Sequence, residues 1–405
     1  MHESVADIAQ IISGATGYVY PNEYLLQWGL LIVMYPFLTG LVAGAFILAS
    51  LERVLGIKEL FPVYRLSLLA ALAFLLAAPL PLLAHLGHPE RSLEMFLTPN
   101  LNSAMAMFGF VYAWYLLVVL LLEIWFDYRK QIVIWSREKT GAMKFLYKIL
   151  SLGIDDISPE ALRFDDKIGK FITIVGVPSA FLLHGYVGFI FGSVKANPWW
   201  SSVLMPVVFL FSAIVSGMAV VLLIYMVTAW FRWKKPGMAC LHKMGELLLY
   251  AMLVDLALEM LDFIHRLYES EESIHILRDL VAKRLFISLI ISQVVLGSLC
   301  PLVGIVFARF GKLPDEVRRM LYFLSAMLVL IGIYSVRWNV VIGGQLFSKS
   351  LRGLTVYKTS LLGMEGLFMS LGLFILPFVI LYVLVKIFPP WTGNEESAGE
   401  TAAPS

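Results

Sequence analysis

The chain has 405 residues, of which 60% are hydrophobic and only 15% are charged, and its mean hydropathy is +0.82. Soluble domains contain roughly 45–50% apolar and about 25% charged residues, so a soluble protein of this length could not cover its cores with so few charges. The formal net charge of +2 is far too small to indicate binding to nucleic acid. These values predict an integral membrane protein that has no nucleic-acid partner.

The first 24 residues predict a segment that lies outside the membrane. They carry Glu3 and Asp7 and lack a basic start, so they do not resemble a cleaved signal peptide. Residues Ser4 to Ser13 are expected to form a short interfacial helix.

Long apolar runs then follow along the rest of the chain. A helix that crosses the hydrocarbon core of about 30 Å needs about 20 mainly apolar residues. Because the runs are continuous rather than alternating in polarity, they exclude a β-barrel and predict an all-α polytopic membrane protein. Nine spans are expected: Leu25 to Leu51, Tyr64 to Leu86, Asn102 to Phe126, Ile168 to Gly192, Val203 to Phe231, Leu241 to His265, Leu285 to Ala308, Val317 to Val336 and Ser360 to Phe388.

Basic residues are distributed unevenly between the two sides that nine spans define. About 21 of the 31 Lys and Arg residues lie on the side of the segment 127–167 and of the C-terminus. By the positive-inside rule this side is cytoplasmic, and the N-terminus is outside the cell membrane. The acidic tail from Asn394 to Ser405 is expected to be cytoplasmic and disordered.

The sixth span concentrates carboxylates, which cost roughly 2.5–3.5 kcal/mol each inside a membrane and therefore indicate function. Glu246, Asp255, Glu259 and Asp262 all fall in it. At about 100° per residue, the last three share one helix face with Arg266. This stripe predicts proton transfer, and a structural ion-pair seam with Arg266 is the alternative.

Histidine and tyrosine side chains predict a second site. His85 and His184 fall in the outer halves of the second and fourth spans, and Tyr35 and Tyr112 lie nearer the middle of the membrane. Such a group can hydrogen-bond the two oxygens of a quinone and accept its protons. Two histidines would hold at most one haem, with no electron path across the membrane, so we expect no haem.

Two further charged residues, Arg337 and Glu365, are expected near the outer side, where they could pair and shape the site or form a purely structural ion pair. The only cysteines, Cys240 and Cys300, have no CxxC spacing. An iron–sulfur cluster needs about four thiolates, so none is expected in this chain, and no metal site is predicted.

Four stretches of the sequence resemble the NrfD/PsrC family, the membrane subunits of respiratory iron–sulfur oxidoreductases. They are FLTGLVAGAF at 37–46, AHLGHPERSLEMF at 84–96, the segment 177–200 and RWNVVIGGQ at 337–345. The second is similar to the family's HLGRP-type segment, with His88 where Arg is usual. The last two are similar to a longer branch that includes the hydrogenase subunit HybB and the sulfite-reduction-associated subunit DsrP.

The resemblance implies two four-helix bundles with the ninth helix added. The implied domains are 1–24, an outer segment; 25–192, the first bundle, with the cytoplasmic connector 127–167; 203–336, the second bundle; 337–359, an outer loop; 360–388, the ninth helix; and 389–405, the tail.

The resemblance also implies a function. The chain would exchange electrons between menaquinol or another quinone and an outer four-cluster ferredoxin-like iron–sulfur subunit, within a larger respiratory complex. Since the chain has proton-active groups but no redox centre, the residues themselves also require such a partner. A proton-coupled secondary transporter and a structural anchor for peripheral redox subunits are the alternatives.

Overall fold

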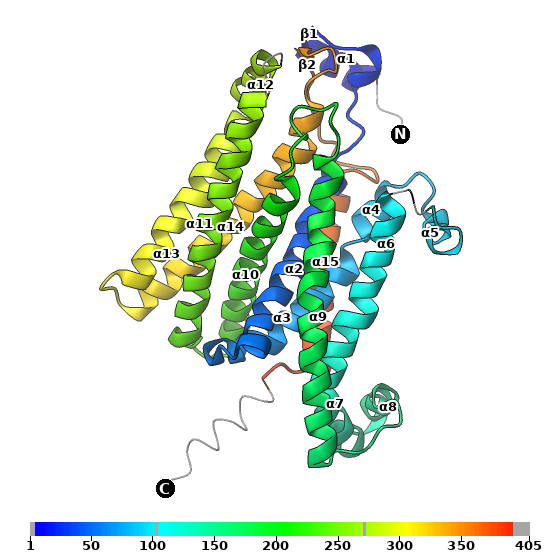
Figure 1. Cartoon of the computed structure of the whole chain (residues 1–405), viewed down its shortest axis with the longest axis vertical. Helices are drawn as coiled ribbons and strands as arrows, with labels where there is room; N and C mark the ends of the chain where they lie inside the picture. The colour runs from blue at the N-terminus through cyan, green and yellow to red at the C-terminus, as the bar shows by residue number, and fades with distance from the viewer. Residues whose placement is uncertain (1–4, 101, 103, 270–272, 392–405) are drawn as a thin grey trace.

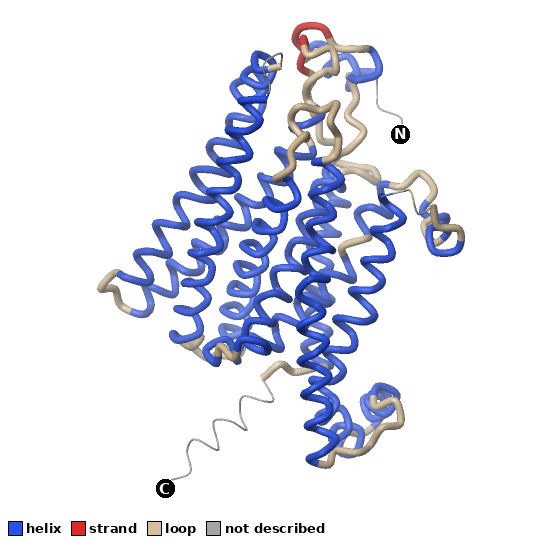
Figure 2. Tube along the Cα trace, in the orientation of Figure 1, coloured by secondary structure: helices blue, strands red, loops and turns tan. Residues whose placement is uncertain are grey.

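The computed structural model describes residues 5–100, 102, 104–269 and 273–391 (Figure 1). Long helices run side by side along the molecule, and loops and two short strands gather at one end (Figure 2). We call this the α1 end, after α1 (Val5–Gly14), and the opposite one the α8 end, after α8 (Gly141–Leu150). The expected interfacial helix thus corresponds to α1, and the acidic tail lies outside the described residues.

Eight helical rods in the described ranges are long and apolar enough to cross a membrane, which confirms an all-α polytopic protein. They are α2 (Leu30–Leu55); α3 (Phe61–Ala77) with α4 (Leu80–His85); α6 (Ala104–Trp114) with the π-helical η4 (Tyr115–Leu120) and α7 (Leu121–Glu138); α9 (Pro159–Gly192); α10 (Met205–Phe231); α12 (Ile274–Leu280) with the π-helical η5 (Val281–Leu299) and α13 (Cys300–Phe310); α14 (Asp315–Val341); and α15 (Leu367–Ile387).

A further long helix, α11 (Met238–Glu269), corresponds to the sixth expected span. It is 32 residues long and packs against α10 and α13, but it has too many charged residues to be counted with the eight rods. Each of the nine expected spans therefore has a helix within the described part of the chain.

Helix α2 lies at the centre of the molecule. All of its residues from Leu30 to Ser50 are buried, and it packs against α3, α9, α10 and α14. Small residues on α2 and α10 allow these helices to pack closely. A Cβ at Gly44 would lie 2.7 Å from Gly217 Cα of α10, so the two backbones are nearly in contact. Because α2 contacts helices of both expected bundles, the division into two bundles stays a prediction.

The connector expected over 127–167 is mostly helical. Helix α7 continues to Glu138, α8 follows, and α9 begins at Pro159. Ser158 caps α9 by accepting a hydrogen bond from the backbone N–H of Ala161. Apolar composition marks only the length inside the membrane, whereas helices continue into water where polar residues and caps support them.

The boundaries around the expected outer loop 337–359 and the ninth span also differ from the structure. Helix α14 continues to Val341, and Arg337 is therefore helical and buried. Helix α15 begins at Leu367 rather than at Ser360, because the preceding segment is an irregular loop with Gly363 at φ +100°. This loop carries Glu365.

Prolines break the second span, as Pro79 and Pro81 interrupt the helix between α3 and α4. The remaining elements are short. They are η1 (Pro21–Glu23), η2 (Lys58–Leu60), η3 (Pro89–Arg91), α5 (Glu94–Leu97) and η6 (Gly343–Gln345), and strands β1 (Thr16–Tyr18) and β2 (Arg352–Leu354), which pair antiparallel with Gly17 opposite Gly353.

Candidate functional site

A polar network is buried between the helices, around Arg337 of α14. Arg337 is completely buried, and its Nη2 donates to Ser212 Oγ at 2.6 Å and to His184 Nε2 at 3.1 Å. Its guanidinium carbon lies 4.1 Å from the centre of the Phe209 ring. The other ring nitrogen of His184 is 3.3 Å from Thr39 Oγ1. We call Thr39, His184, Ser212 and Arg337 the central network.

Since an arginine can only donate, His184 Nε2 must accept, and the imidazole is neutral with its proton on Nδ1. The histidine has no exposed surface. A Cβ at Gly40 of α2 would be 3.2 Å from its Cε1, so any side chain at this position would crowd the ring. Neighbouring helices therefore enclose His184 completely.

Two carboxylates of α11 face the central network. Asp255 and Glu259 are within electrostatic range of Arg337. Glu259 Oε2 accepts a hydrogen bond of 3.1 Å from Gln293 of η5, whose own oxygen accepts one of 2.7 Å from Asn339 of α14. Within the described residues, Asp255 Oδ1 and Glu259 Oε1 have no hydrogen-bond partner. Buried carboxylate oxygens that are able to take up a proton thus lie beside the central network.

The other two acidic residues expected in the sixth span, Asp262 and Glu246, have different surroundings. Asp262 accepts from Arg266 Nε at 2.7 Å and from the Ser202 hydroxyl, which makes it part of a closed ion pair. Glu246 lies toward the α8 end, 3.7 Å from Lys243 and 3.9 Å from Arg309. The structure therefore separates Asp255 and Glu259, each with an oxygen that has no hydrogen-bond partner within the described residues, from Asp262, which lies in an ion-pair seam with Arg266, as in the alternative interpretation.

A second cluster lies at the α1 end of the helices. His85, at the end of α4, places its Nδ1 2.6 Å from Glu365 Oε1, and both side chains are about one-fifth exposed, at 23% and 19%. A Cβ at Gly29 would be 3.1 Å from both Glu365 Oε2 and Tyr357 Oη. Tyr357 Oη also accepts a hydrogen bond of 3.2 Å from the N–H of Leu30. We call His85, Tyr357 and Glu365 the α1-end cluster.

The expected pairing of Arg337 with Glu365 is replaced by two other pairings. Arg337 bonds to His184, and Glu365 bonds to His85. The sequence placed all four residues near one level but could not say which of them meet. Loop 355–366 brings Glu365 to α4, and the helical course of α14 directs Arg337 to α9.

The two tyrosines of the expected site lie on α2 and α6. Tyr112 of α6 donates to the carbonyl oxygen of Leu75 at 2.5 Å. Tyr35 of α2 is 6% exposed and lies within electrostatic range of Tyr112 and Tyr186.

Sequence reasoning missed a third buried group, which lies toward the α8 end. Glu123 of α7 is 1% exposed and accepts a hydrogen bond of 2.8 Å from Thr173 of α9. Its position in the apolar run LLEIWF was a usable signal, since a lone carboxylate in a span is costly. Gln293 and Asn339 gave no such signal, because uncharged polar residues are common in membrane helices.

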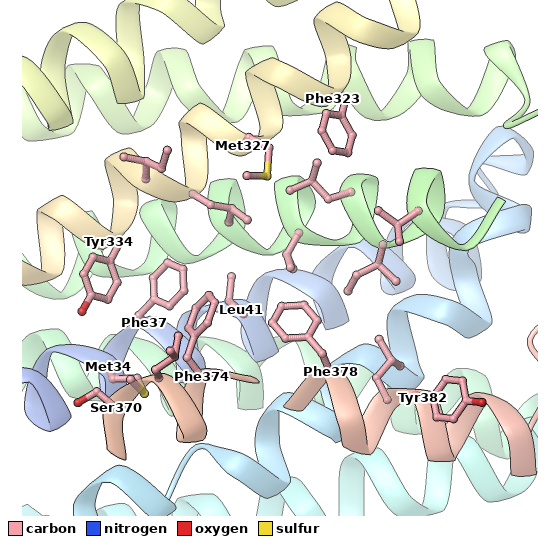
Figure 3. Close-up of a pocket in the computed structure, with 18 of the residues that line it drawn as sticks. Met34, Phe37, Leu41, Phe323, Met327, Tyr334, Ser370, Phe374, Phe378 and Tyr382 are labelled. Carbon is pink, nitrogen blue, oxygen red and sulfur yellow. The ribbon is translucent and has the colours of Figure 1, made fainter. Parts of the chain in front are cut away.

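A large apolar groove lies between four helices (Figure 3). Its volume is about 800 Å³, and it is lined by α2 from Leu30 to Leu41, α10 from Val220 to Phe231, α14 from Phe323 to Ser335 and α15 from Leu367 to Val385. Its lining, taken from the described residues, contains no charged side chain. In the same ranges, no group of three or more His, Cys, Asp or Glu side chains is arranged to hold a metal ion.

Fold and site together define a multi-pass helical membrane protein with charged groups buried between its helices and a partly exposed histidine–carboxylate pair at one end. The family described as "Polysulphide reductase, NrfD" matches residues 19–349. The chain belongs to this family, and the resemblance seen in its motifs is confirmed.

Several proteins are similar to the chain. A selenate reductase subunit of Mesobacillus selenatarsenatis is 32% identical over 89% of this chain and 86% of its own length. A putative dimethyl sulfoxide reductase membrane subunit of Halobacterium salinarum is 27% identical over 55% of this chain and 48% of its own. Protein NrfD of Escherichia coli is 26% identical over 49% and 59%. None of these names tests the assignment to the longer branch.

Proposed function

We propose that the chain is the quinone-reactive membrane subunit of a respiratory oxidoreductase complex and that it oxidises menaquinol for an iron–sulfur partner subunit. Family membership supports the general role, since the similar proteins are named as subunits of reductases. The observation that carries the proposal is the pair of His85 and Glu365 at the α1 end. The pair contains a proton acceptor, and both side chains are partly exposed, so a substrate can reach it.

The pair has the geometry of a general base. With Glu365 ionised, the proton of His85 lies on Nδ1 and is donated to Glu365, which leaves Nε2 with a lone pair. Nε2 can therefore accept the hydroxyl proton of a quinol that approaches from the membrane. Positive charge that develops on the imidazole is offset by the carboxylate 2.6 Å away.

Tyr357 supplies a hydrogen-bond donor beside this base. Burial raises the pKa of its phenol, and the nearby Glu365 carboxylate raises it further, so the hydroxyl stays protonated at neutral pH. It can donate to a quinol or quinone oxygen while its own oxygen accepts from the Leu30 N–H. A base and a donor at one site match the two oxygens of the substrate.

Protons and electrons then take separate routes. Two electrons must leave each quinol, and the chain's two cysteines are too few for an iron–sulfur cluster. We assign the electrons to a ferredoxin-like iron–sulfur subunit docked at the α1 end. We assign proton transfer to the central network with Asp255 and Glu259, and we include His184 there, because both of its ring nitrogens are already bonded.

The orientation of the chain in the membrane follows from the distribution of its basic residues. The α8 end carries the basic segment 127–167, so this end is cytoplasmic and the α1 end faces outward. The proposed base is therefore on the side where the partner docks.

The test compares two variants in the assembled complex. Replacing His85 by Leu removes the acceptor, one contact worth roughly 1–3 kcal/mol, so quinol-linked turnover should fall about five- to a hundredfold and quinone affinity should fall with it. Asp255→Asn keeps the size of the side chain but cannot release a proton, so it should slow turnover while quinone affinity is retained. Glu246→Gln, in the surface ion pair at the α8 end, is the control and should change neither.

The rival functions give other patterns. A proton-coupled transporter predicts loss of solute uptake in Asp255→Asn and no quinone-dependent effect in His85→Leu. A structural anchor predicts normal turnover in all three variants, provided that the complex assembles.

A further inference from the structure

The apolar groove ends at the α1-end cluster. Leu30, the first residue of its lining on α2, is also the residue whose N–H bonds to Tyr357. Leu367, the first lining residue of α15, follows Glu365 by two positions, and Tyr334 of α14 is within electrostatic range of Tyr357. A molecule that lay in the groove would therefore have one end beside Tyr357 and Glu365, the partner of His85.

The groove is as long as the membrane is thick. Its lining on α15 runs from Leu367 to Val385, and at about 1.5 Å per residue this corresponds to roughly 27 Å. The hydrocarbon core is about 30 Å thick, so an acyl chain of a phospholipid reaches only to its middle. Helix α2 lines the half of the groove toward the α1 end, and α10 lines the half toward the α8 end. Helices α14 and α15 line both halves. One long chain fits this shape better than a phospholipid of either leaflet.

Hydroxyl groups lie at both ends of the groove, and one of those at the α1 end, that of Ser370, is buried. Tyr334 and Ser370 lie at the same end in Figure 3, beside Met34, whereas Phe323 and Tyr382 lie at the other. Ser370 is 4% exposed, and its Oγ has no hydrogen-bond partner within the described residues. A buried hydroxyl without a partner costs free energy, so it points to a polar ligand atom at the α1 end.

We propose that this groove holds the isoprenoid tail of the quinol, with the headgroup at the α1-end cluster. This proposal rests on the proposed function. It adds that the groove is the part of the protein that selects a long-tailed substrate. The lining is apolar and adaptable, with Met34 and Met327 among aromatic rings, which suits a branched hydrocarbon chain. The tail lies between α14 and α15, and the substrate enters sideways from the lipid.

The test fills the groove away from the headgroup. Met327→Trp on α14 places an indole in the groove, and Leu324→Trp on the same helix is the matched control, because Leu324 is 48% exposed and does not line the groove. A second pair on α15 is Leu371→Trp, in the lining, and Ile375→Trp, which is 48% exposed outside it. Turnover of the assembled complex is measured with a long-tailed menaquinol and with a tail-less naphthoquinol.

Both groove variants should raise KM for the long-tailed quinol about tenfold, the loss expected when a few methylene groups leave an apolar site. The KM for the tail-less quinol should not change, and the controls should resemble the unmodified chain with both substrates. Long-tailed quinone that is extracted from the purified complex should be lost in the same two variants.

If the groove variants change KM equally for both quinols, or for neither, the assignment of the groove to the tail is overturned. The proposed function is tested separately by His85→Leu and would not be affected by that result. A phospholipid lost from the groove variants in native mass spectrometry, with unchanged KM, would assign the groove to lipid. A complex with neither quinol turnover nor bound quinone contradicts the proposed function itself, and this proposal with it.

Discussion

Arg337 is the residue whose burial and charge we expect to affect the stability of the interior most. It is the largest completely buried side chain among the described residues, and two carboxylates of α11, Asp255 and Glu259, are within electrostatic range of it. Its hydrogen bonds go to uncharged groups, so its charge is compensated only through space. In a low dielectric such compensation is strong, and the removal of one partner leaves the others uncompensated.

Arg337→Met should therefore destabilise the protein strongly. Breaking a buried charge pair costs about 3–5 kcal/mol, because the remaining charge stays buried. Thermal unfolding in detergent measures the effect, and Arg352→Met, at an exposed site of the α1 end, is the control with little expected change.

The double variant Arg337→Met with Asp255→Asn should recover part of the loss, since it removes one of the carboxylates that Arg337 compensates. If the double variant is as unstable as the sum of the two single variants, the arginine and the carboxylate act independently, contrary to our interpretation.

At the scale of helices, the crossing of α2 and α10 decides how the two halves of the chain meet. A Cβ at Gly44 would lie 2.1 Å from the carbonyl oxygen of Ala213, and one at Gly217 would lie 2.3 Å from Gly44 Cα. The neighbours are backbone atoms, which cannot move aside as a flexible side chain would. Close packing of small residues is what holds membrane helices together in the absence of a hydrophobic effect between them.

Gly44→Val should separate these helices and cost about 1–3 kcal/mol or more, the usual range for overpacking. Gly372→Val is the matched control, because Gly372 is also a membrane-helix glycine but has open space around it. Unfolding and proteolysis of the purified protein compare the two. Equal stability of the two variants would show that the contact contributes little.

For the whole molecule, the distribution of charge predicts its orientation in the membrane. Glu90 lies in the loop at the α1 end, and Thr140 lies between α7 and α8 at the other end; both are exposed. In a background with Ser in place of Cys240 and Cys300, a membrane-impermeant thiol reagent should label Glu90→Cys in intact cells. Thr140→Cys should react only after the membrane is permeabilised.

The reverse labelling pattern would place the α8 end outside and move the partner's docking side to the cytoplasm. Labelling of both positions in intact cells would mean that an even number of spans separates them.

The sequence by itself determined the class of fold, the family and the approximate positions of nine helices. This is possible because hydrocarbon imposes one-dimensional rules: a span must be about 20 residues long, mainly apolar and hydrogen-bonded within itself. It also singled out His184, Asp255, Glu259 and Arg337, because ionisable side chains are costly in any membrane helix.

Only the tertiary structure decided which of these side chains meet. His85 pairs with Glu365, 280 positions away, because an irregular loop before α15 returns to α4. Asp262 is closed by Arg266, whereas Asp255 and Glu259 face Arg337, although all share one helix face. Periodicity shows the direction of a side chain around its own helix, but its partner depends on how neighbouring helices cross. The crossing of helices is set by close contacts such as that of Gly44 with Gly217. These residues are far apart in the sequence, so the sequence alone does not reveal the contact.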